Sequence, residues 1–165
     1  MSGLRLEGAW LPGAVGDIAA LHGRHYAASH GMGVGFEGRV AAALGAFLEK
    51  LDARSLFRCV VDDGGRVLGS IVIDGTQTPL AQLRWFILAG ELRGQGWGRR
   101  LMQAAMDHAA GFPGAYLYTM EGLDAAIHLY RGFGFVETAR VPDLQWNTPI
   151  TNIRMEWHRG ERAMG

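Results

Sequence analysis

The sequence has a single cysteine and no surplus of either charge. Cys59 alone excludes an internal disulfide framework and a zinc site built from several cysteines, and its apolar neighbours indicate a buried, inert thiol. Acidic side chains number 16 and basic side chains 16, so the formal net charge at pH 7 is +0. The chain therefore lacks the basic surplus of a general nucleic-acid binder, and we expect no nucleic-acid partner.

Long hydrophobic runs, repeats and low-complexity tracts are also lacking. No apolar stretch is long enough to cross a bilayer, and the first residues lack a signal-peptide pattern, so we expect a cytoplasmic protein without a membrane partner. What is present is 165 residues with 48% hydrophobic side chains, enough for one domain with a real core. We expect a single domain over residues 1–158 and a flexible tail over 159–165.

The strongest pattern lies in residues 83–101. An apolar, aromatic run over 83–88 predicts a strand, glycines occupy positions 94, 96 and 98, and helical periodicity follows. A helix N-terminus presents unpaired N–H groups and favours negative charge, and glycines let an anion approach them closely. Arg93, Arg99 and Arg100 add positive charge. The stretch is therefore predicted to bind a pyrophosphate, unless its glycines serve only the turn into the helix.

The spacing narrows the choice of pyrophosphate site. A Walker-type loop needs Lys and then Ser or Thr after its last glycine, and a dinucleotide fingerprint needs G-x-G-x-x-G. Neither pattern is present. Arg93, Gly96 and Gly98 instead match R-x-x-G-x-G, which resembles the acyl-CoA-binding motif of the GNAT superfamily of N-acyltransferases.

Hydrophobic periodicity predicts the order β-α-α-β-β-β-α-β-α-β-β, with a mobile glycine-rich loop at 30–36 and an irregular connection at 144–150. This is a mixed α/β (α+β) fold with a largely antiparallel sheet and helices on both faces. The expected strands lie near 4–10, 57–61, 67–73, 83–88, 116–119, 135–138 and 151–157, and the expected helices near 17–30, 37–51, 96–109 and 123–131.

A second motif supports the same family. Residues 126–135 resemble the later A-x-x-L-Y-x-x-x-G-F segment of GNAT proteins, and the element order is also theirs. Details such as Leu129-Tyr130 are most similar to GNAT domains fused to MarR-type regulators. No winged-helix segment is present, so we expect a stand-alone catalytic unit.

The resemblance implies acetyl-CoA as co-substrate, bound in a gap between splayed strands. Backbone groups of the central strand would pair with the pantetheine arm, and one amide near Phe86 or Leu88 would polarise the thioester carbonyl. Trp97 has two interpretations, packing or lining of the cofactor groove. The implied cofactor-binding residues are Phe86, Ile87, Leu88, Arg93, Gly94, Gln95, Gly96, Trp97, Gly98, Arg99 and Ala126.

Tyr130 is the expected general acid of an N-acetyltransferase working by direct attack of an amine on the thioester. The thiolate that leaves has a conjugate acid with a pKa near ~8.5, which a nearby phenol roughly matches. The alternative is a half-buried aromatic that closes the helix.

Two departures from the family pattern matter. Leu123 stands where the family often has Asn, seven residues before the tyrosine, so one polar contact to the pantetheine is missing. The sequence pattern identifies no carboxylate as the general base. A base is unnecessary if the amine is already uncharged when it binds. No metal site is expected, since His22 and His25 lack an evident third ligand. The open candidates for a base are Glu37, Glu121, Asp124, His25 and His30.

The acceptor site would be walled by the 30–36 loop and the connection after residue 144. The aromatic, amide and hydroxyl side chains of these segments suggest a small polar amine or a peptide N-terminus as the acceptor. The oligomeric state stays open, and a homodimer is one possibility. Two rival functions remain: a non-catalytic acyl-CoA sensor or interaction module, and a mononucleotide-binding domain. The expected acceptor-binding residues are His30, Phe36, Glu37, Trp146 and Asn147, with Thr148 beside them.

Overall fold

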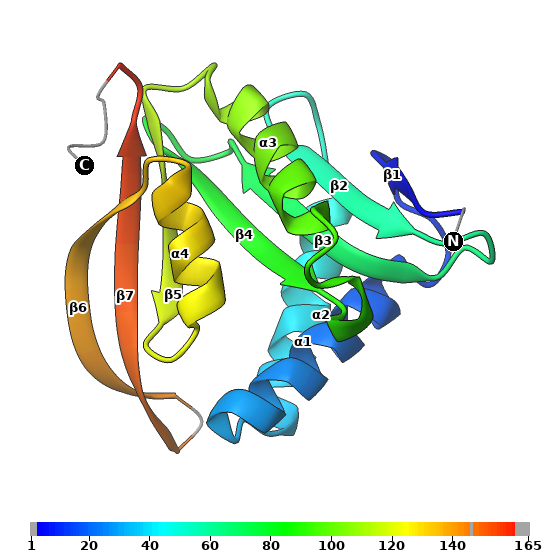
Figure 1. The fold of residues 1–165 in the computed structure, drawn as a ribbon, viewed down its shortest axis with the longest axis horizontal. Coiled ribbons are helices and arrows are strands. Elements are labelled where there is room, and N and C mark those ends of the chain that lie inside the picture. Colours follow the sequence, from blue (N-terminus) through cyan, green and yellow to red (C-terminus); the bar gives the residue numbers. More distant parts are fainter. Residues whose placement is uncertain (1–2, 146, 161–165) are drawn as a thin grey trace.

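The fold was obtained as a computed structural model that describes residues 3–145 and 147–160 (Figure 1). Within these residues the element order is the predicted one, with one short 3-10 turn, η1, added before α3. The elements are β1 (Arg5–Glu7), α1 (Ala14–His30), α2 (Val34–Glu49), β2 (Leu56–Val61), β3 (Val67–Asp74), β4 (Ala81–Leu88), η1 (Gly90–Leu92), α3 (Trp97–Ala109), β5 (Gly114–Met120), α4 (Asp124–Gly132), β6 (Val136–Gln145) and β7 (Thr148–His158).

The strands form one seven-stranded sheet with the order β1-β2-β3-β4-β5-β7-β6. All neighbours pair antiparallel except β4 and β5, which run parallel. A connection between parallel neighbours must cross over the sheet, and here α3 makes that crossover. The predicted mixed, largely antiparallel α/β fold is confirmed.

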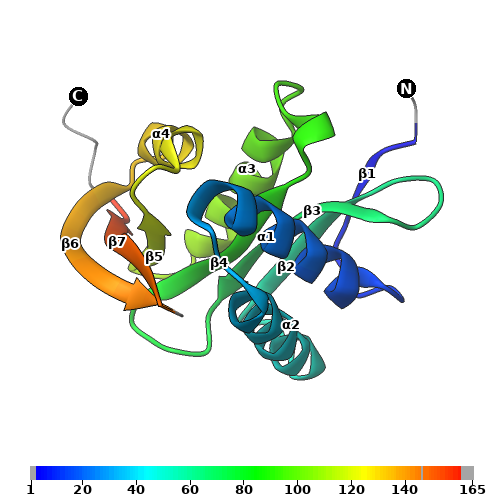
Figure 2. The ribbon, with the colours of Figure 1, turned by 90° about the horizontal axis from the view of Figure 1, so that it is seen from below.

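Helices cover both faces of the sheet (Figure 2). α1 and α2 lie on one face, and a core cluster with Ile18, Leu44 and Phe57 at its centre fills the space beneath them. α3 and α4 lie on the other face, above a larger cluster that includes Leu101 and Phe135. No helix among the described residues is long and apolar enough to span a membrane.

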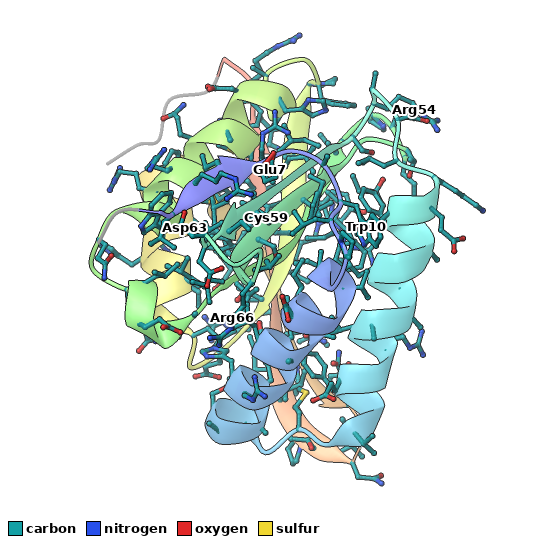
Figure 3. All side chains as sticks on the ribbon, turned by 90° about the vertical axis from the view of Figure 1, so that its right-hand side faces the viewer. Glu7, Trp10, Arg54, Cys59, Asp63 and Arg66 are labelled. Carbon is teal, nitrogen blue, oxygen red and sulfur yellow. The ribbon has the colours of Figure 1, made fainter. Side chains whose placement is uncertain are left out.

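Cys59 lies in β2, within the sheet that Figure 3 shows from its β1 side. Its side chain is fully buried and unpaired with any other sulfur. Burial raises the pKa of the thiol to about 11, with a smaller contribution from Glu7. The thiol is therefore protonated at neutral pH, as expected of an unreactive core cysteine.

The predicted mobile loop at 30–36 is wrong. α1 runs to His30 and α2 begins at Val34, so only residues 31–33 connect them. Gly35 lies inside α2, and the ring of Phe36 packs 4.8 Å from that of Tyr26. Tertiary packing outweighs the low helix propensity of glycine here, which costs only about 1 kcal/mol per residue.

The predicted irregular connection at 144–150 is also wrong, because β6 runs to Gln145, β7 begins at Thr148, and these two residues pair. Pro142 lies in β6, which is an edge strand, and edge strands are where sheets accommodate proline. Pro149 lies in β7 beyond Asn152, the last residue that pairs with β5. Both prolines therefore sit where strand geometry tolerates them. α1 likewise begins earlier than expected, after Gly13.

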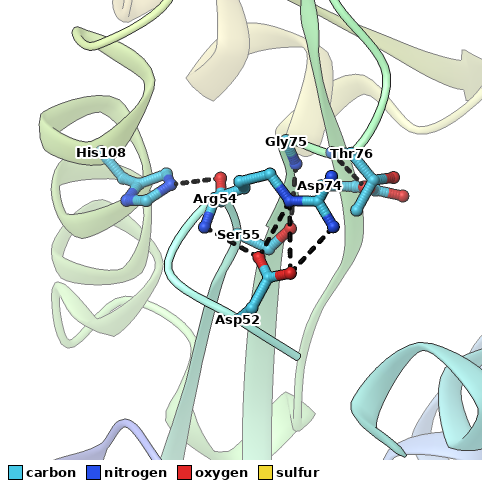
Figure 4. Close-up of polar contacts among 7 residues, drawn as sticks. All are labelled: Asp52, Arg54, Ser55, Asp74, Gly75, Thr76 and His108. Carbon is cyan, nitrogen blue, oxygen red and sulfur yellow. Dashed lines mark hydrogen bonds and ion pairs between the residues drawn. The ribbon is translucent and has the colours of Figure 1, made fainter. Parts of the chain in front are cut away.

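A polar network holds the segment between α2 and β2 against its surroundings (Figure 4). His108 of α3 donates from Nε2 to the carbonyl of Arg54 at 2.8 Å, and the Gly75 amide donates to the hydroxyl of Ser55 at 3.0 Å. The Arg54 guanidinium is paired with Asp52 at 2.8 Å. These contacts tie α3 and the end of β3 to one another on the side of the molecule away from the cavity described next.

Candidate active site

The two central strands separate along their length. β4 and β5 pair only at Ala81–Ala115 and Gln82–Tyr116. Past these positions the two strands diverge, and residues 83–88 line a cavity of about 500 Å³ together with Tyr118 and Thr119. α1 closes one side of this cavity and α4 another. The gap between splayed strands that the resemblance implied is therefore present in the fold.

The glycine turn opens into this cavity. Gly94 and Gly96 have φ values of 77° and 85°, in the left-handed region that favours glycine. Gly96 is the N-cap of α3 and no side chain caps the helix, so its first N–H groups are free for a ligand. Gly94, Gly96 and Gly98 all line the cavity. The turn thus presents bare amides, without competing side chains, to whatever occupies the space.

Two arginines add positive charge at the same end. Arg93 and Arg99 both line the cavity. The Arg93 Nη2 lies 3.3 Å from Nδ1 of His25 on α1, and the Arg99 guanidinium lies 5.6 Å from the centre of the Phe133 ring. Arg93 precedes the glycine turn and Arg99 lies in the first turn of α3, so the two cations flank the turn, which suits a site for a doubly charged group.

Not every predicted cofactor residue reaches the cavity. Gln95 lies outside its lining and donates from its side chain to the Glu91 carbonyl at 3.0 Å. Trp97 packs against the main core cluster, with the Arg100 guanidinium 4.2 Å from its ring centre. Of its two interpretations, the geometry shows packing. The remaining predicted positions, Phe86, Ile87, Leu88, Arg93, Gly94, Gly96, Gly98, Arg99 and Ala126, line the cavity.

β4 carries a bulge where it lines the cavity. Ser70 pairs with Ile87 but Val72 pairs with Arg84, so two residues of β4, Trp85 and Phe86, face one of β3. Trp85 has a φ of 48°, a strained conformation for a bulky residue. The fully buried hydroxyl of Ser70 donates to the Trp85 carbonyl at 2.7 Å and holds this conformation. The bulge interrupts the ladder and redirects the backbone around Phe86.

Tyr130 is on α4, and its ring is buried between Phe86 and Phe135, with centroid separations of 5.9 and 6.1 Å. No described residue hydrogen-bonds its hydroxyl. Among the described residues no fully buried side-chain oxygen or nitrogen lacks a partner, so this hydroxyl is reached from the cavity that Tyr130 lines. Burial raises the pKa of the phenol well above its ordinary value, with a smaller effect from Tyr26. Tyr130 is thus a protonated donor at the cavity wall.

The expected acceptor-binding residues that the structure describes, His30, Phe36, Glu37 and Asn147, lie outside the cavity lining. His30 donates from Nε2 to the Glu121 carbonyl at 2.9 Å, and Glu37 packs directly over Gly23, where no Cβ would fit. Asn147 is at the tip of the β6–β7 hairpin, and Trp146 falls outside the described residues. The cavity lining includes Tyr26, Ser29, Arg84, Trp85 and Tyr118 in their place.

The candidate bases are separated by the fold. Asp124 and His25 line the cavity, whereas Glu37, His30 and Glu121 do not. The Glu121 carboxylate is 3.7 Å from the Arg140 guanidinium, in a partly exposed pair. Among the described residues no three His, Cys, Asp or Glu side chains are placed to hold a metal ion.

Sequence reasoning did not recognise that one stripe of α1 borders the cavity. His22, His25, Tyr26 and Ser29 all face the cavity, at the i, i+3, i+4, i+7 spacing that puts residues on one helix face. That spacing was the available signal. A polar, aromatic stripe on a helix that otherwise packs on a core marks the side that borders a cavity rather than the core.

Comparison with known proteins agrees with this geometry. Residues 24–135 match the sequence model of the acetyltransferase (GNAT) family. The chain belongs to the GNAT family. The matched residues include the second half of α1, the glycine turn and Tyr130, whereas His22 lies just before them.

Solved structures share the fold. An acetyltransferase from Streptococcus agalactiae has a TM-score of 0.74 at 17% identity, with 96% of this chain and 99% of that chain covered. A GCN5-related N-acetyltransferase from Kribbella flavida has a TM-score of 0.74 at 22% identity over 94% and 98%. A spermidine N-acetyltransferase from Vibrio cholerae, solved with CoA and spermine, has a TM-score of 0.68 at 19% identity over 96% and 97%. No curated protein sequence matches the chain.

Proposed function

We propose that this GNAT protein is an acetyl-CoA-dependent N-acetyltransferase that moves an acetyl group to the amine of a small molecule or peptide by direct attack. The observation that carries the proposal is that one cavity joins two features. The uncapped N-terminus of α3, with Gly94, Gly96 and Gly98, borders one end of the cavity. Tyr130, whose hydroxyl has no hydrogen-bond partner among the described residues, lines its wall. A pyrophosphate suits the first feature and a leaving thiolate suits the second.

The proposed reaction forms one bond and breaks one. The amine nitrogen attacks the thioester carbonyl carbon, the C–S bond breaks, and the products are an amide and a thiol. Backbone N–H groups at the bulge, near Phe86 or Leu88, would stabilise the developing oxyanion, which is the role of preorganised donors in acyl transfer. Tyr130 would donate to the departing sulfur. Arg93 and Arg99 would neutralise phosphate charge at the far end.

A carboxylate placed in the cavity tests binding. Gly98 lines the cavity, has no left-handed φ, and a Cβ there would meet Leu129 and Phe86 at ordinary contact distances of 3.5 and 3.6 Å. Gly98→Glu therefore adds negative charge beside the phosphate site without backbone strain. Gly132→Glu is the matched control, because Gly132 ends α4, is exposed, and has open space around it.

Calorimetric titration of acetyl-CoA should show binding to the wild type and to Gly132→Glu, and at least tenfold weaker binding to Gly98→Glu. Equal binding by all three proteins, or none by the wild type, contradicts the proposal. Thiol release would then be followed with spermidine, phosphinothricin, free amino acids and a dipeptide as acceptors, the first two being named for structural relatives. Binding without transfer to any amine would favour the non-catalytic sensor.

A further inference from the structure

His22 is a buried imidazole that the proposed reaction has not yet used. It lies on α1 with 5% of its surface exposed. Its Nδ1 is 2.8 Å from the carbonyl oxygen of Ile18, one helical turn earlier. A carbonyl only accepts hydrogen bonds, so Nδ1 must carry the hydrogen. In the neutral ring the other nitrogen, Nε2, is then unprotonated and has a free lone pair.

That lone pair faces the cavity. No described residue hydrogen-bonds Nε2, and no fully buried side-chain nitrogen or oxygen among the described residues lacks a partner. Nε2 is therefore reached from open space, and the space that His22 lines is the cavity of the proposed active site. Burial lowers the pKa of the imidazole to about 4, so the ring is neutral at pH 7 and able to accept a proton.

The neighbours of His22 link it to Tyr130, the proposed proton donor. Its ring stacks on that of Tyr26, parallel within 4° and with centroids 6.2 Å apart. Tyr26 is also close enough to Tyr130 to raise the pKa of that phenol. His25, beside Arg93, is a further titratable group near His22. An unprotonated nitrogen on α1 and a protonated hydroxyl on α4 thus border the same cavity, with one tyrosine near both.

We propose that His22 Nε2 accepts the proton that the attacking amine loses. This rests on the proposed function. As the C–N bond forms, the amine nitrogen becomes positive and its proton passes to Nε2; the C–S bond breaks, and the thiolate receives a proton from Tyr130. The proton on His22 then replaces the one that Tyr130 gave up, so the protein is unchanged after one cycle.

The chemistry of His22 constrains the acceptor. The buried imidazole, with its lowered pKa, is too weak a base to deprotonate a free alkylammonium ion, whose pKa is about 10. The amine must therefore enter uncharged. Once bonded to carbon, its nitrogen is far more acidic, and the oxyanion formed beside it stabilises an imidazolium ion. His22 therefore acts after attack begins and not before it.

Paired amide substitutions separate the two ring nitrogens. The amide of His22→Asn can occupy the position of Nδ1 and keep the bond to Ile18, but it leaves no acceptor at the position of Nε2. The amide of His22→Gln reaches the position of Nε2 but cannot hold a proton. Both should lower kcat about 10²-fold or more for the amine that the wild type acetylates fastest, with the acetyl-CoA Kd within twofold of wild type.

His22→Ala gives the third measurement. Added imidazole should restore its turnover in proportion to the fraction of imidazole in the free-base form, which a purely structural role for His22 would not produce. Wild-type kcat in His22→Asn, a weakened acetyl-CoA Kd with kcat unchanged, or the absence of imidazole rescue in a folded His22→Ala would each overturn the inference. A wild type that binds no acetyl-CoA fails in the earlier titration, and the inference falls with the proposed function.

Discussion

Tyr130 shows how burial alters a role expected from residue type. The prediction that Tyr130 is the general acid compared the ordinary pKa of a phenol with that of a thiol. In the structure the ring is enclosed by Phe86 and Phe135, and burial raises the pKa of the phenol further from that of a thiol in water. Burial beside Tyr130 would also disfavour a free thiolate and raise the pKa of a thiol bound there. In the proposed reaction Tyr130 would therefore donate to the sulfur only as negative charge develops on it.

Tyr130→Phe should lower kcat about 10²-fold while the acetyl-CoA Kd stays within twofold, because the hydroxyl acts in the transition state and the ring keeps its packing. Steady-state kinetics and calorimetry measure the two quantities. Tyr116→Phe is the matched control, since Tyr116 lies on β5 outside the cavity lining and donates only a 3.3 Å bond to Gln82. Unchanged turnover in Tyr130→Phe would remove the tyrosine from the mechanism.

At the scale of the element, β4 depends on a partner remote in the sequence. The apolar run at 83–88 predicted a strand, which is correct. It did not predict the bulge, because the left-handed Trp85 is stabilised by Ser70, on β3. Local patterns likewise could not show that Phe36 would pack on Tyr26 and extend α2. Periodicity reports which face is apolar, and contacts across the fold decide where elements bend and end.

Ser70→Ala should lower the free energy of unfolding by about 1–3 kcal/mol, because it leaves the Trp85 carbonyl without its buried donor. It should also lower kcat, since the released bulge no longer fixes the amides near Phe86. Urea unfolding and steady-state kinetics measure the two effects.

Ser55→Ala is the control for this prediction. Ser55 is also buried and accepts a 3.0 Å bond from the Gly75 amide, in the network of Figure 4, away from the bulge. It should lose comparable stability but keep its kcat. If both serine variants keep wild-type turnover, the bulge does not depend on Ser70.

At the scale of the whole molecule, the cavity is a product of topology. Its walls come from α1, β4, β5 and α4, which the sequence places far apart. The glycine turn and the segment around Tyr130 could be found from motifs, because each is a short local pattern. The rest of the lining could not, because Tyr26, Trp85 and Tyr118 lie on α1, β4 and β5 and border one cavity only in the folded chain. The acceptor residues that the resemblance implied, Phe36, Glu37 and Asn147 among them, lie outside this lining.

Acid should destabilise the folded protein partly through His22. Its pKa is about 4 in the folded state, against 6.5 for an exposed histidine, so between these values the unfolded chain binds more protons. The free energy of unfolding therefore rises with pH between these two values. As the pH falls toward 4, protonation of His22 lowers it by about 3 kcal/mol. The lowered pKa of His25 acts in the same direction.

Urea unfolding at pH 4.5 and pH 7.5 tests this dependence. The stability difference between the two pH values should be smaller in His22→Asn than in the wild type, because asparagine does not titrate. An equal difference in the two proteins would mean that the imidazole is solvated in the folded state.

The two-residue junction between β4 and β5 has a consequence beyond catalysis. Past Gln82, the β4 backbone groups that face β5 have no strand beside them. A thioester arm seated there would bridge the two halves of the sheet as a removable eighth strand. Such a ligand stabilises the fold by about 2.7 kcal/mol at a hundred times its Kd. The supply of thioester in a cell would then set how long each copy of the protein survives, as well as how fast it works.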